Sequence, residues 1–381
     1  MIPYGRQHIS QQDINAVLQV LQSDFLTQGP AVPAFEHALA GLTGAKDVVA
    51  VNSATSALHI ACLALGVGPQ SRVWTSPISF VASANCALYC GAVVDFVDVE
   101  LQSGNMDMAA LARKLEAAAM CNELPDLVIP VHLAGYSCDM QQLQQLAQSY
   151  GFKVIEDASH AVGAEYSGKP VGCCTFSDIT VFSFHPVKII TTAEGGAALT
   201  NQPPLAEAMR RLRSHGITRD PALMQDAPDG PWYYQQLELG FNYRMTELQG
   251  ALGLSQSRQL TAFVSKRREL AKRYNRMLAE SPLVLPPVEA LERSAWHLYI
   301  VQLQQPEKRL EVFNALRAAG IGVNVHYIPI HTQPYYQQLG FSAGDFPQAE
   351  QFYRGIISLP LYPDLTEAQQ NYICEQLVQL L

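Results

Sequence analysis

One lysine stands inside an otherwise apolar stretch of the chain. Lys188 lies in TVFSFHPVKIITTAEGGA (180–197), where Val187, Ile189 and Ile190 flank it and no carboxylate is adjacent. Most lysines are solvated surface charges, and buried lysines are rare. An apolar setting lowers the pKa of a lysine, and only the neutral amine attacks a carbonyl. Lys188 is therefore a candidate for Schiff-base chemistry.

Other polar residues end neighbouring β-branched runs. Asp157 closes KVIED and His160 follows it by three residues, while Ser183 closes ITVFS. Asp157 either caps the next helix or holds a proton on a ring nitrogen of a ligand. His160 taken alone is more typical of a hydrogen-bonded core histidine than of a ligand contact.

The segment NSATS (52–56) connects the run VVAV to the helical pattern ALHIACLAL. Small residues at a helix start let backbone N–H groups approach an anion, and the helix dipole favours the negative charge. An ordinary Ser or Thr N-cap is the alternative. No GxGxxG or GxxxxGK[ST] pattern occurs here, which argues against a dinucleotide or nucleoside triphosphate site.

These features together suit pyridoxal phosphate (PLP). Its phosphate needs a helix N-terminus, its ring nitrogen a carboxylate, and its aldehyde a lysine. Its ring face needs a stacking partner, for which Phe80 in SPISF is a candidate, although an aromatic residue there also fits a core. The combination is more specific than any single feature.

The first two-thirds of the chain alternates short β-branched runs with helical patterns. This alternation predicts an α/β fold with a largely parallel sheet covered on both faces. Ligands of such sheets bind at the carboxyl ends of the strands, where these polar residues fall. The predicted strands are 48–51, 72–76, 93–99, 127–133, 153–157, 179–184 and 197–200, and the predicted helices are 55–65, 80–90, 107–119 and 139–150.

The pattern changes after residue 215. The stretch 215–245 is rich in Pro, Gly and aromatic residues and predicts a long ordered loop. We expect a large PLP-binding α/β domain over 1–250, and a connector helix (246–280) leading into a smaller α+β domain over 251–381. The smaller domain is predicted to contain strands 297–303 and 322–328 and helices 306–319 and 366–380.

Composition limits the function. The 381 residues carry a net charge of −9, which disfavours nucleic acid or an anionic membrane as a partner. The basic run from Lys266 to Arg276 has the spacing of a solvated helix face. The eight cysteines include no CxxC pair, and we expect no metal site. With no signal peptide or membrane-spanning run visible, the reducing cytoplasm is the expected compartment.

Several stretches carry a resemblance to a known family. They are SDFLTQGP (23–30), NSATSALH (52–59), PISFVASAN (77–85), VIEDASHAVGA (154–164), FSFHPVKIITTAEGG (182–196), SHGITRD (214–220), FNYRMTELQGALG (241–253) and VHYIPIH (325–331). From end to end, the chain resembles the sugar aminotransferases of the DegT/DnrJ/EryC1/StrS family, which are fold-type I PLP enzymes. One departure is Ala193, where members of the family often carry Gly; it bears on local backbone geometry.

The resemblance implies a role for each matching residue. Lys188 would carry the cofactor as a Schiff base, and Asp157 would pair with the pyridinium nitrogen. Asn242 would reach the phosphate in a neighbouring subunit, which implies a homodimer with shared active sites. The other cofactor contacts would be Ala54, Thr55, Phe80, His160 and Ser183, and the nucleotide-sugar contacts would be Tyr4, Phe25, Leu26, Thr27, Val325, His326 and Tyr327.

The combination of SDFLTQGP, FHPVK, SHGITRD and VHYIPIH most resembles one branch of the family. Its members transfer an amino group from L-glutamate to C4 of a UDP-linked 4-keto-6-deoxy-N-acetylhexosamine in pseudaminic acid biosynthesis. The alternatives are C3 or C4 transfer to another keto sugar, linked to dTDP or leading to UDP-bacillosamine, and a PLP sugar dehydratase. Dehydratase relatives typically replace the lysine with histidine, so Lys188 favours transfer.

Two further alternatives come from other protein classes. An amino-acid aminotransferase needs an arginine clamp for the substrate carboxylate, and the candidates are Arg293, Arg309, Arg317 and Arg354. A PLP-binding regulator usually carries a DNA-binding extension, and the sequence has no separate basic domain.

Overall fold

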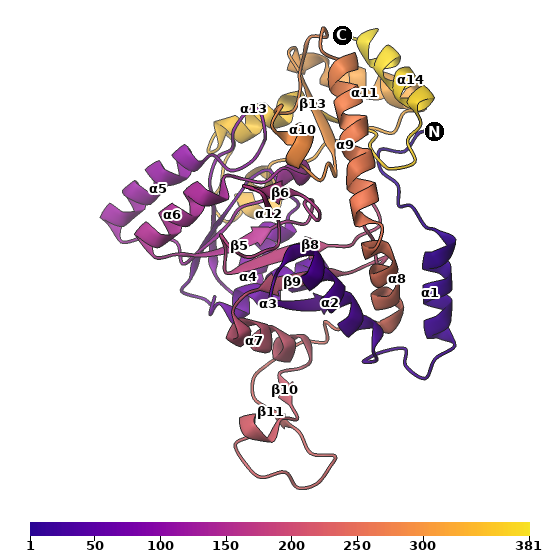
Figure 1. Ribbon diagram of the computed structural model, residues 1–381. Helices are drawn as coiled ribbons and strands as arrows, with labels where there is room; N and C mark the ends of the chain where they lie inside the picture. The colour runs from indigo at the N-terminus through magenta and orange to yellow at the C-terminus, as the bar shows by residue number, and fades with distance from the viewer.

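A seven-stranded sheet forms the centre of the molecule in the computed structural model, which describes residues 1–381 (Figure 1). Its strand order is β1-β9-β8-β5-β4-β2-β3. Only β9 runs antiparallel to its neighbours, so the predicted, largely parallel sheet is confirmed. The strands are β1 (Asp47–Val51), β2 (Arg72–Thr75), β3 (Val93–Phe96), β4 (Leu127–Ile129), β5 (Lys153–Asp157), β8 (Ile179–Ser183) and β9 (Gly196–Thr200).

Helices cover both faces of this sheet, as alternate residues of one strand show. On β5, Ile155 packs in a core with α3 (Ala54–Ala64), α4 (Ala82–Tyr89) and α7 (Pro203–Arg213). Its neighbour Val154 packs in a second core with α5 (Met108–Cys121) and α6 (Met140–Tyr150). On this second face, α2 (Ala31–Thr43) covers β1, β8 and β9. Because strand side chains alternate, the strands are buried on both sides.

The chain between α7 and α8 forms a projecting arm. Figure 1 shows this arm standing away from the rest of the molecule beyond α7. It contains the paired strands β10 (Ile217–Thr218) and β11 (Gln235–Gln236) and the short 3-10 helix η2 (Pro221–Leu223). The predicted long loop is therefore a small hairpin with connecting turns, and it exposes Trp232, Tyr234 and Leu239.

The predicted connector helix 246–280 is two helices. α8 (Glu247–Ser257) and α9 (Leu260–Met277) are separated by Arg258 and Gln259. The Ser257 hydroxyl donates a hydrogen bond to the Leu254 carbonyl at 2.8 Å, a local bond that competes with regular helix geometry. The single long helix was therefore a wrong prediction.

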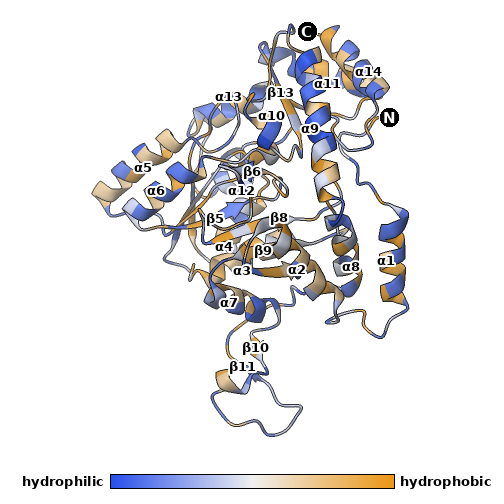
Figure 2. Ribbon diagram, viewed as in Figure 1, coloured by the Kyte–Doolittle hydropathy of each residue, from blue (hydrophilic) through white to orange (hydrophobic).

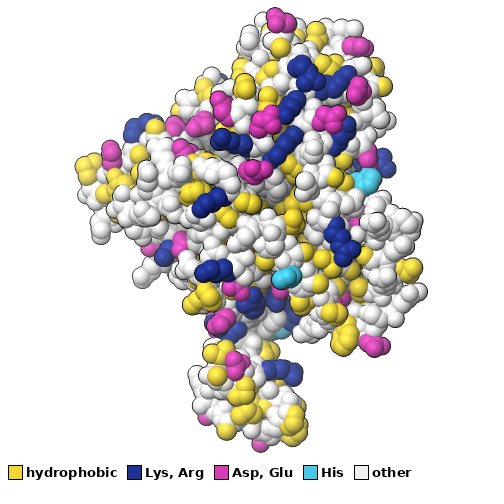
Figure 3. Space-filling view, viewed as in Figure 1, with side chains coloured by type: hydrophobic (Ala, Val, Ile, Leu, Met, Phe, Trp, Pro, Cys, Tyr) yellow, Lys and Arg dark blue, Asp and Glu magenta, His cyan; other side chains and the backbone are white.

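The basic residues of α9 have mixed surroundings. Lys266, Arg268 and Lys272 pair with Glu269, Glu165 and Glu292, and Figure 3 shows Lys and Arg mixed with acids over this helix. These residues form the expected solvated face. Arg267 is the exception, because it is 1% exposed.

A second, three-stranded antiparallel sheet lies beside α9 in the order β12-β13-β14. Figure 2 shows both hydrophobic and hydrophilic residues on α9 and α14, as helices with one buried face require. The strands are β12 (Leu283–Val284), β13 (Tyr299–Leu303) and β14 (Ile356–Leu359), and the helices are α10 (Ala290–Arg293), η3 (Pro306–Lys308), α11 (Arg309–Ala318), η4 (Ile330–Thr332), α12 (Pro334–Gln337), α13 (Pro347–Gly355) and α14 (Glu367–Val378).

The predicted strand 322–328 is not a strand. It makes a single antiparallel bridge, Asn324 to Ser358, and the third strand of this sheet is β14. The side-chain Oδ1 of Asn324 accepts the Val325 N–H at 2.8 Å, a local bond that competes with strand pairing.

The N-terminal segment links the two sheets. Ile2 pairs with Ile321 and packs in the core of the smaller unit, whereas α1 (Gln11–Leu21) packs against α8. The remaining elements are the 3-10 turn η1 (Leu133–Gly135) and the hairpin of β6 (Glu165–Tyr166) and β7 (Lys169–Pro170). The division of the chain at residue 250 stays a prediction. None of the helices is both long and apolar enough to cross a membrane.

Candidate active site

A cavity of about 480 Å³ opens at the carboxyl edge of the large sheet. β5 and β8 end there with Asp157 and Ser183, and the turns after β1, β2 and β4 supply other walls. Ten residues expected in the site line the cavity: Tyr4, Ala54, Thr55, Phe80, Asp157, His160, Ser183, Lys188, His326 and Tyr327. The fold therefore brings together residues that are scattered over most of the chain.

The N-terminus of α3 forms one wall. Ser53 caps the helix by accepting the Ser56 N–H, whereas the N–H groups of Ala54 and Thr55 have no acceptor within the chain. Gly196 allows this approach, because a Cβ on it would lie 2.5 Å from the Ala54 nitrogen. Two free amides at the positive end of a helix fit a phosphate group.

Asp157 is buried and held in a fixed orientation. Its Oδ2 accepts a hydrogen bond from the Ser83 hydroxyl at 2.6 Å, and its Oδ1 accepts the Ser159 N–H at 3.1 Å. Ser83 lies on α4, 74 positions away in sequence, and the sequence analysis missed it. A carboxylate fixed in this way fits a protonated ring nitrogen.

Lys188 follows β8 and is half-buried at the cavity wall. Burial lowers the pKa of its amine to about 8, and the negative charge of Asp157 opposes that shift. A substantial fraction of the lysine is therefore neutral near pH 8, as nucleophilic attack on a carbonyl requires.

His160 is a neutral hydrogen-bond donor. Its Nδ1 accepts the Ala134 N–H at 3.2 Å, so its proton lies on Nε2, which bonds to the Tyr327 hydroxyl at 3.0 Å. Burial, followed by the charge of Lys188, lowers the pKa of His160 well below its ordinary value. Burial, with a smaller contribution from Asp157, raises the pKa of Tyr327. Both side chains are therefore uncharged near neutral pH.

Two more histidines lie near the lysine. Burial, with help from Lys188, lowers the pKa of His326 to about 3, and its Nδ1 lies 2.8 Å from the Ser358 hydroxyl. His297 was missed by the sequence analysis, although its Nε2 is 3.4 Å from the Lys188 amine. No local signal marks His297, because it precedes β13 in an ordinary strand pattern.

The structure leaves five expected site residues outside this cavity. Phe25 and Leu26 are 54% and 51% exposed, and Thr27 and Asn242 are also exposed. Val325 is half-buried and packs in a hydrophobic core instead. Within one chain these residues do not contribute to the cavity wall, and their roles stay predictions.

Ala193 has a left-handed backbone with φ of 67°. This conformation favours glycine, which is the residue that family members often carry there. The departure noted in the sequence therefore falls at a position where glycine would be easier to accommodate.

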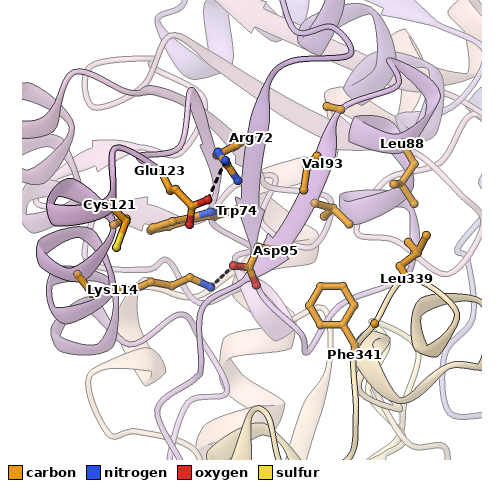
Figure 4. A pocket seen from close by; sticks show the side chains of 15 residues that line it. Arg72, Trp74, Leu88, Val93, Asp95, Lys114, Cys121, Glu123, Leu339 and Phe341 are labelled. Carbon is orange, nitrogen blue, oxygen red and sulfur yellow. Dashed lines mark hydrogen bonds and ion pairs between the residues drawn. The ribbon is translucent and has the colours of Figure 1, made fainter.

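A second, larger cavity of about 730 Å³ lies at the edge strand β3 (Figure 4). Its charged side chains neutralise one another: Arg72 bonds Glu123 at 3.1 Å and Lys114 bonds Asp95 at 2.6 Å. Lys114 also donates to the Phe96 carbonyl. No charged group is left free to hold a ligand, so the smaller cavity is the candidate active site.

The model of the DegT/DnrJ/EryC1/StrS aminotransferase family matches residues 7–378. The chain belongs to the DegT/DnrJ/EryC1/StrS aminotransferase family. A UDP-4-amino-4,6-dideoxy-N-acetyl-beta-L-altrosamine transaminase of Campylobacter jejuni is 36% identical to it over 100% of this chain and 98% of the relative.

Solved structures of the DegT/DnrJ/EryC1/StrS family share the whole fold. Helicobacter pylori PseC, an aminotransferase involved in the biosynthesis of pseudoaminic acid, superposes with a TM-score of 0.90 at 34% identity. That match covers 100% of this chain and 98% of PseC. The PLP form of Spr1654 from Streptococcus pneumoniae, described as a sugar aminotransferase, gives a TM-score of 0.89 at 29% identity and covers 100% and 98%. The predicted aminotransferase fold is confirmed.

Proposed function

We propose that this protein is a PLP-dependent aminotransferase that moves the amino group of L-glutamate to C4 of a UDP-linked 4-keto-6-deoxy-N-acetylhexosamine. The product would be UDP-4-amino-4,6-dideoxy-N-acetyl-beta-L-altrosamine, for pseudaminic acid biosynthesis. The observation that carries the proposal is one cavity holding an amine of lowered pKa, a fixed carboxylate and two free helix amides. The names of the Campylobacter and Helicobacter relatives support the sugar.

The residues present fit PLP. Lys188 would hold its aldehyde, Asp157 its ring nitrogen, and the Ala54 and Thr55 amides its phosphate, with Ser183 beside them. His160 and Phe80 would flank the ring. When bound, this cofactor supplies an electron sink for the bond that breaks at the amino acid.

Lys188 is the proton carrier in this proposal. Once displaced by the incoming amino group, its amine takes a proton from the donor carbon and returns one to the sugar carbon. A pKa of about 8 suits both directions, because a base titrating near ambient pH accepts and donates with similar ease. Asp157 keeps its charge directed at the ring nitrogen because Ser83 and Ser159 both donate to it.

The cavity wall favours a sugar over a second amino acid as the specific substrate. None of Arg293, Arg309, Arg317 and Arg354 lines the cavity, so within one chain no arginine clamp awaits a carboxylate. The cavity wall instead includes Tyr4, His326 and Tyr327, which place hydroxyl and imidazole groups beside the space for polar sugar substituents.

We also propose a homodimer in which a second copy completes each site. Asn242 and Phe25 to Thr27 lie exposed outside the cavity of their own chain, and the projecting arm exposes apolar side chains (Figure 3). Exposed apolar surface of this kind is typical of an interaction site. A monomer by analytical ultracentrifugation at assay concentration would contradict the dimer.

The deciding experiment is incubation of the protein and PLP with glutamate and a panel of UDP- and dTDP-linked 4-keto sugars. NMR of the products reads the position and stereochemistry of the new amine. We expect amination at C4 of the UDP-linked 4-keto-6-deoxy-N-acetylhexosamine. Turnover only of a dTDP sugar would overturn the substrate, and loss of water without amination would indicate a dehydratase.

A further inference from the structure

His297 is the one residue that hydrogen-bonds the Lys188 side chain and that the sequence did not suggest. Its Nε2 lies 3.4 Å from the Lys188 Nζ, and its ring centre is 4.4 Å from that of His160. The residue is buried, yet it lines the cavity. It comes from the segment before β13, 109 positions beyond the lysine.

The backbone around His297 is held from two sides. On one side, the Ala295 N–H donates to the Gly135 carbonyl at 3.0 Å and the Leu298 N–H donates to the Ala134 carbonyl at 3.3 Å. Gly135 makes this approach possible, because a Cβ on it would lie 2.9 Å from the Trp296 nitrogen. The same turn places the Ala134 N–H on His160.

On the other side, the buried guanidinium of Arg267 holds three carbonyl groups. Its Nη1 donates to the carbonyls of Trp296 at 3.0 Å, His297 at 3.3 Å and Leu361 at 2.9 Å, and no carboxylate pairs with it. Trp296 has a left-handed backbone with φ of 52°, which costs free energy that these contacts must offset. A strained backbone retained beside a reactive group indicates that the position of the neighbouring side chain, here His297, is important.

We propose that His297 is a positioning residue that accepts a hydrogen bond from the free Lys188 amine and holds that amine at the cavity wall. This inference rests on the proposed function, because it concerns the interval when the lysine is released from the cofactor. A released lysine side chain has four rotatable bonds, and holding one rotamer keeps the amine within reach of the reacting carbon.

Hydrogen-bond chemistry gives the direction. An ammonium group has three donors and no acceptor, so His297 Nε2 must accept from it. Burial, followed by the charges of Lys188, His160, Arg267 and His326, lowers the pKa of His297 well below its ordinary value. The imidazole is therefore neutral and able to accept. When Nε2 accepts, the single ring proton lies on Nδ1, which is buried and has no partner. A second proton would have to occupy Nε2, facing the Lys188 ammonium, so His297 is an acceptor of the hydrogen bond without being a base.

Asp157, His160, His297 and His326 interact electrostatically with the amine. The other titratable side chains that line the cavity are Tyr4, His185, Glu194 and Tyr327. Asp157 favours the ammonium form by charge, and the His297 lone pair favours it by hydrogen bonding. Removing the acceptor therefore lowers the pKa of Lys188 further, while a replacement acceptor at the Nε2 position preserves it.

The test is competitive acetylation of the full-length, cofactor-free protein with isotopically labelled acetic anhydride from pH 6 to pH 10. Mass spectrometry of the peptide containing Lys188 gives the midpoint of its titration. For the native sequence we expect a midpoint near 8. His297→Phe should shift the midpoint downward, and His297→Gln, whose amide oxygen reaches the Nε2 position, should restore most of it.

A matched control removes a different buried histidine. His331 also has an unpartnered Nδ1 and bonds Glu350 through Nε2, away from the cavity. His331→Phe should leave the Lys188 midpoint unchanged. In the PLP-loaded enzyme, His297→Phe should lower kcat about 10- to 100-fold with little change in KM, and His297→Gln should recover part of it.

An unchanged Lys188 midpoint in folded His297→Phe would overturn the proposal, and folding is checked by circular dichroism. His297→Leu gives a second acceptor-free side chain for the same measurement if the Phe variant does not fold. Acetylation needs no cofactor, so it reports on the contact alone. The proposed function fails separately if the native protein with PLP and borohydride gives no pyridoxyl group on Lys188.

Discussion

Two cavities of this molecule each contain one lysine and one aspartate, and they differ in how these two side chains are paired. At the sheet edge, Lys114 and Asp95 bond each other at 2.6 Å and their charges cancel (Figure 4). At the strand ends, Lys188 and Asp157 share a cavity without forming an ion pair, and Asp157 instead accepts Ser83 and Ser159. The larger cavity is thus neutralised and the smaller one keeps a free amine and a free carboxylate.

The volume of a cavity alone therefore does not identify an active site. Burial lowers the pKa of both Lys114 and Lys188, and an aspartate opposes the shift in each case. The difference is that Asp95 bonds the Lys114 amine directly, whereas Asp157 acts on the Lys188 amine without pairing with it. Parallel strands end at one edge of a sheet, so groups at their ends converge on one ligand. At the edge strand β3, no polar groups from several strand ends meet. The charged side chains there pair with one another.

Substitutions of the two lysines should differ most in their effect on turnover. Lys188→Ala should lower turnover about 1,000-fold or more, because both proton transfers lose their carrier, while PLP still binds by its phosphate and ring contacts. Lys114→Ala should leave turnover unchanged. Steady-state rates and PLP absorbance measure both, and near-normal rates in Lys188→Ala would remove this lysine from the mechanism.

The two aspartates give the next test. Asp157→Ala should weaken PLP binding about 10- to 100-fold, since the ring nitrogen loses its only buried carboxylate partner, and should lower turnover as well. Asp95→Ala serves as the control and should bind PLP normally. Fluorescence titration with PLP measures the affinity. Normal affinity in Asp157→Ala would contradict the assigned orientation of the ring.

A smaller loss of turnover is expected for Ser83, which acts through Asp157. Ser83→Ala removes one of the two hydrogen bonds that fix Asp157, and should lower turnover about 5- to 20-fold. Steady-state rates measure this loss, and unaltered turnover with reduced thermal stability would make Ser83 structural only.

A substitution in the cavity at β3 should change the stability of the protein without changing its activity. Lys114→Met keeps an unbranched apolar side chain and loses the contact of the Lys114 Nζ with the Trp74 ring. It also loses the bonds to Asp95 and the Phe96 carbonyl. We expect a loss of about 1 to 2 kcal/mol in the free energy of unfolding, since one buried acceptor loses its partner. Urea denaturation measures it, and a simultaneous loss of activity would show that the two cavities are coupled.

The smallest effect concerns the loop beside Lys188. Ala193→Gly should raise the free energy of unfolding by up to about 1 kcal/mol, because the left-handed backbone at φ of 67° costs alanine more than glycine. Turnover should stay within about 2-fold of the native value. Destabilisation instead would mean that glycine's greater freedom in the unfolded chain outweighs the relief.

Sequence patterns alone predict the alternating strands and helices, and they mark Lys188, Asp157 and the start of α3 as site candidates. Local patterns carry that information: the period of the apolar residues predicts each element, and one charged residue in an apolar run is visible without the fold. The predictions from local pattern were wrong where a side chain hydrogen-bonds the backbone, as at the break between α8 and α9 and in 322–328.

Only the tertiary structure brought Ser83 to Asp157 and His297 to Lys188, across separations of 74 and 109 residues. It also fixed the tautomer of His160 through the Ala134 N–H and buried Arg267 within a helix that otherwise follows a surface pattern. These contacts join segments that have no regular spacing in sequence. Their positions depend on how the helices and the turn at Gly135 pack, and packing is a property of the whole fold.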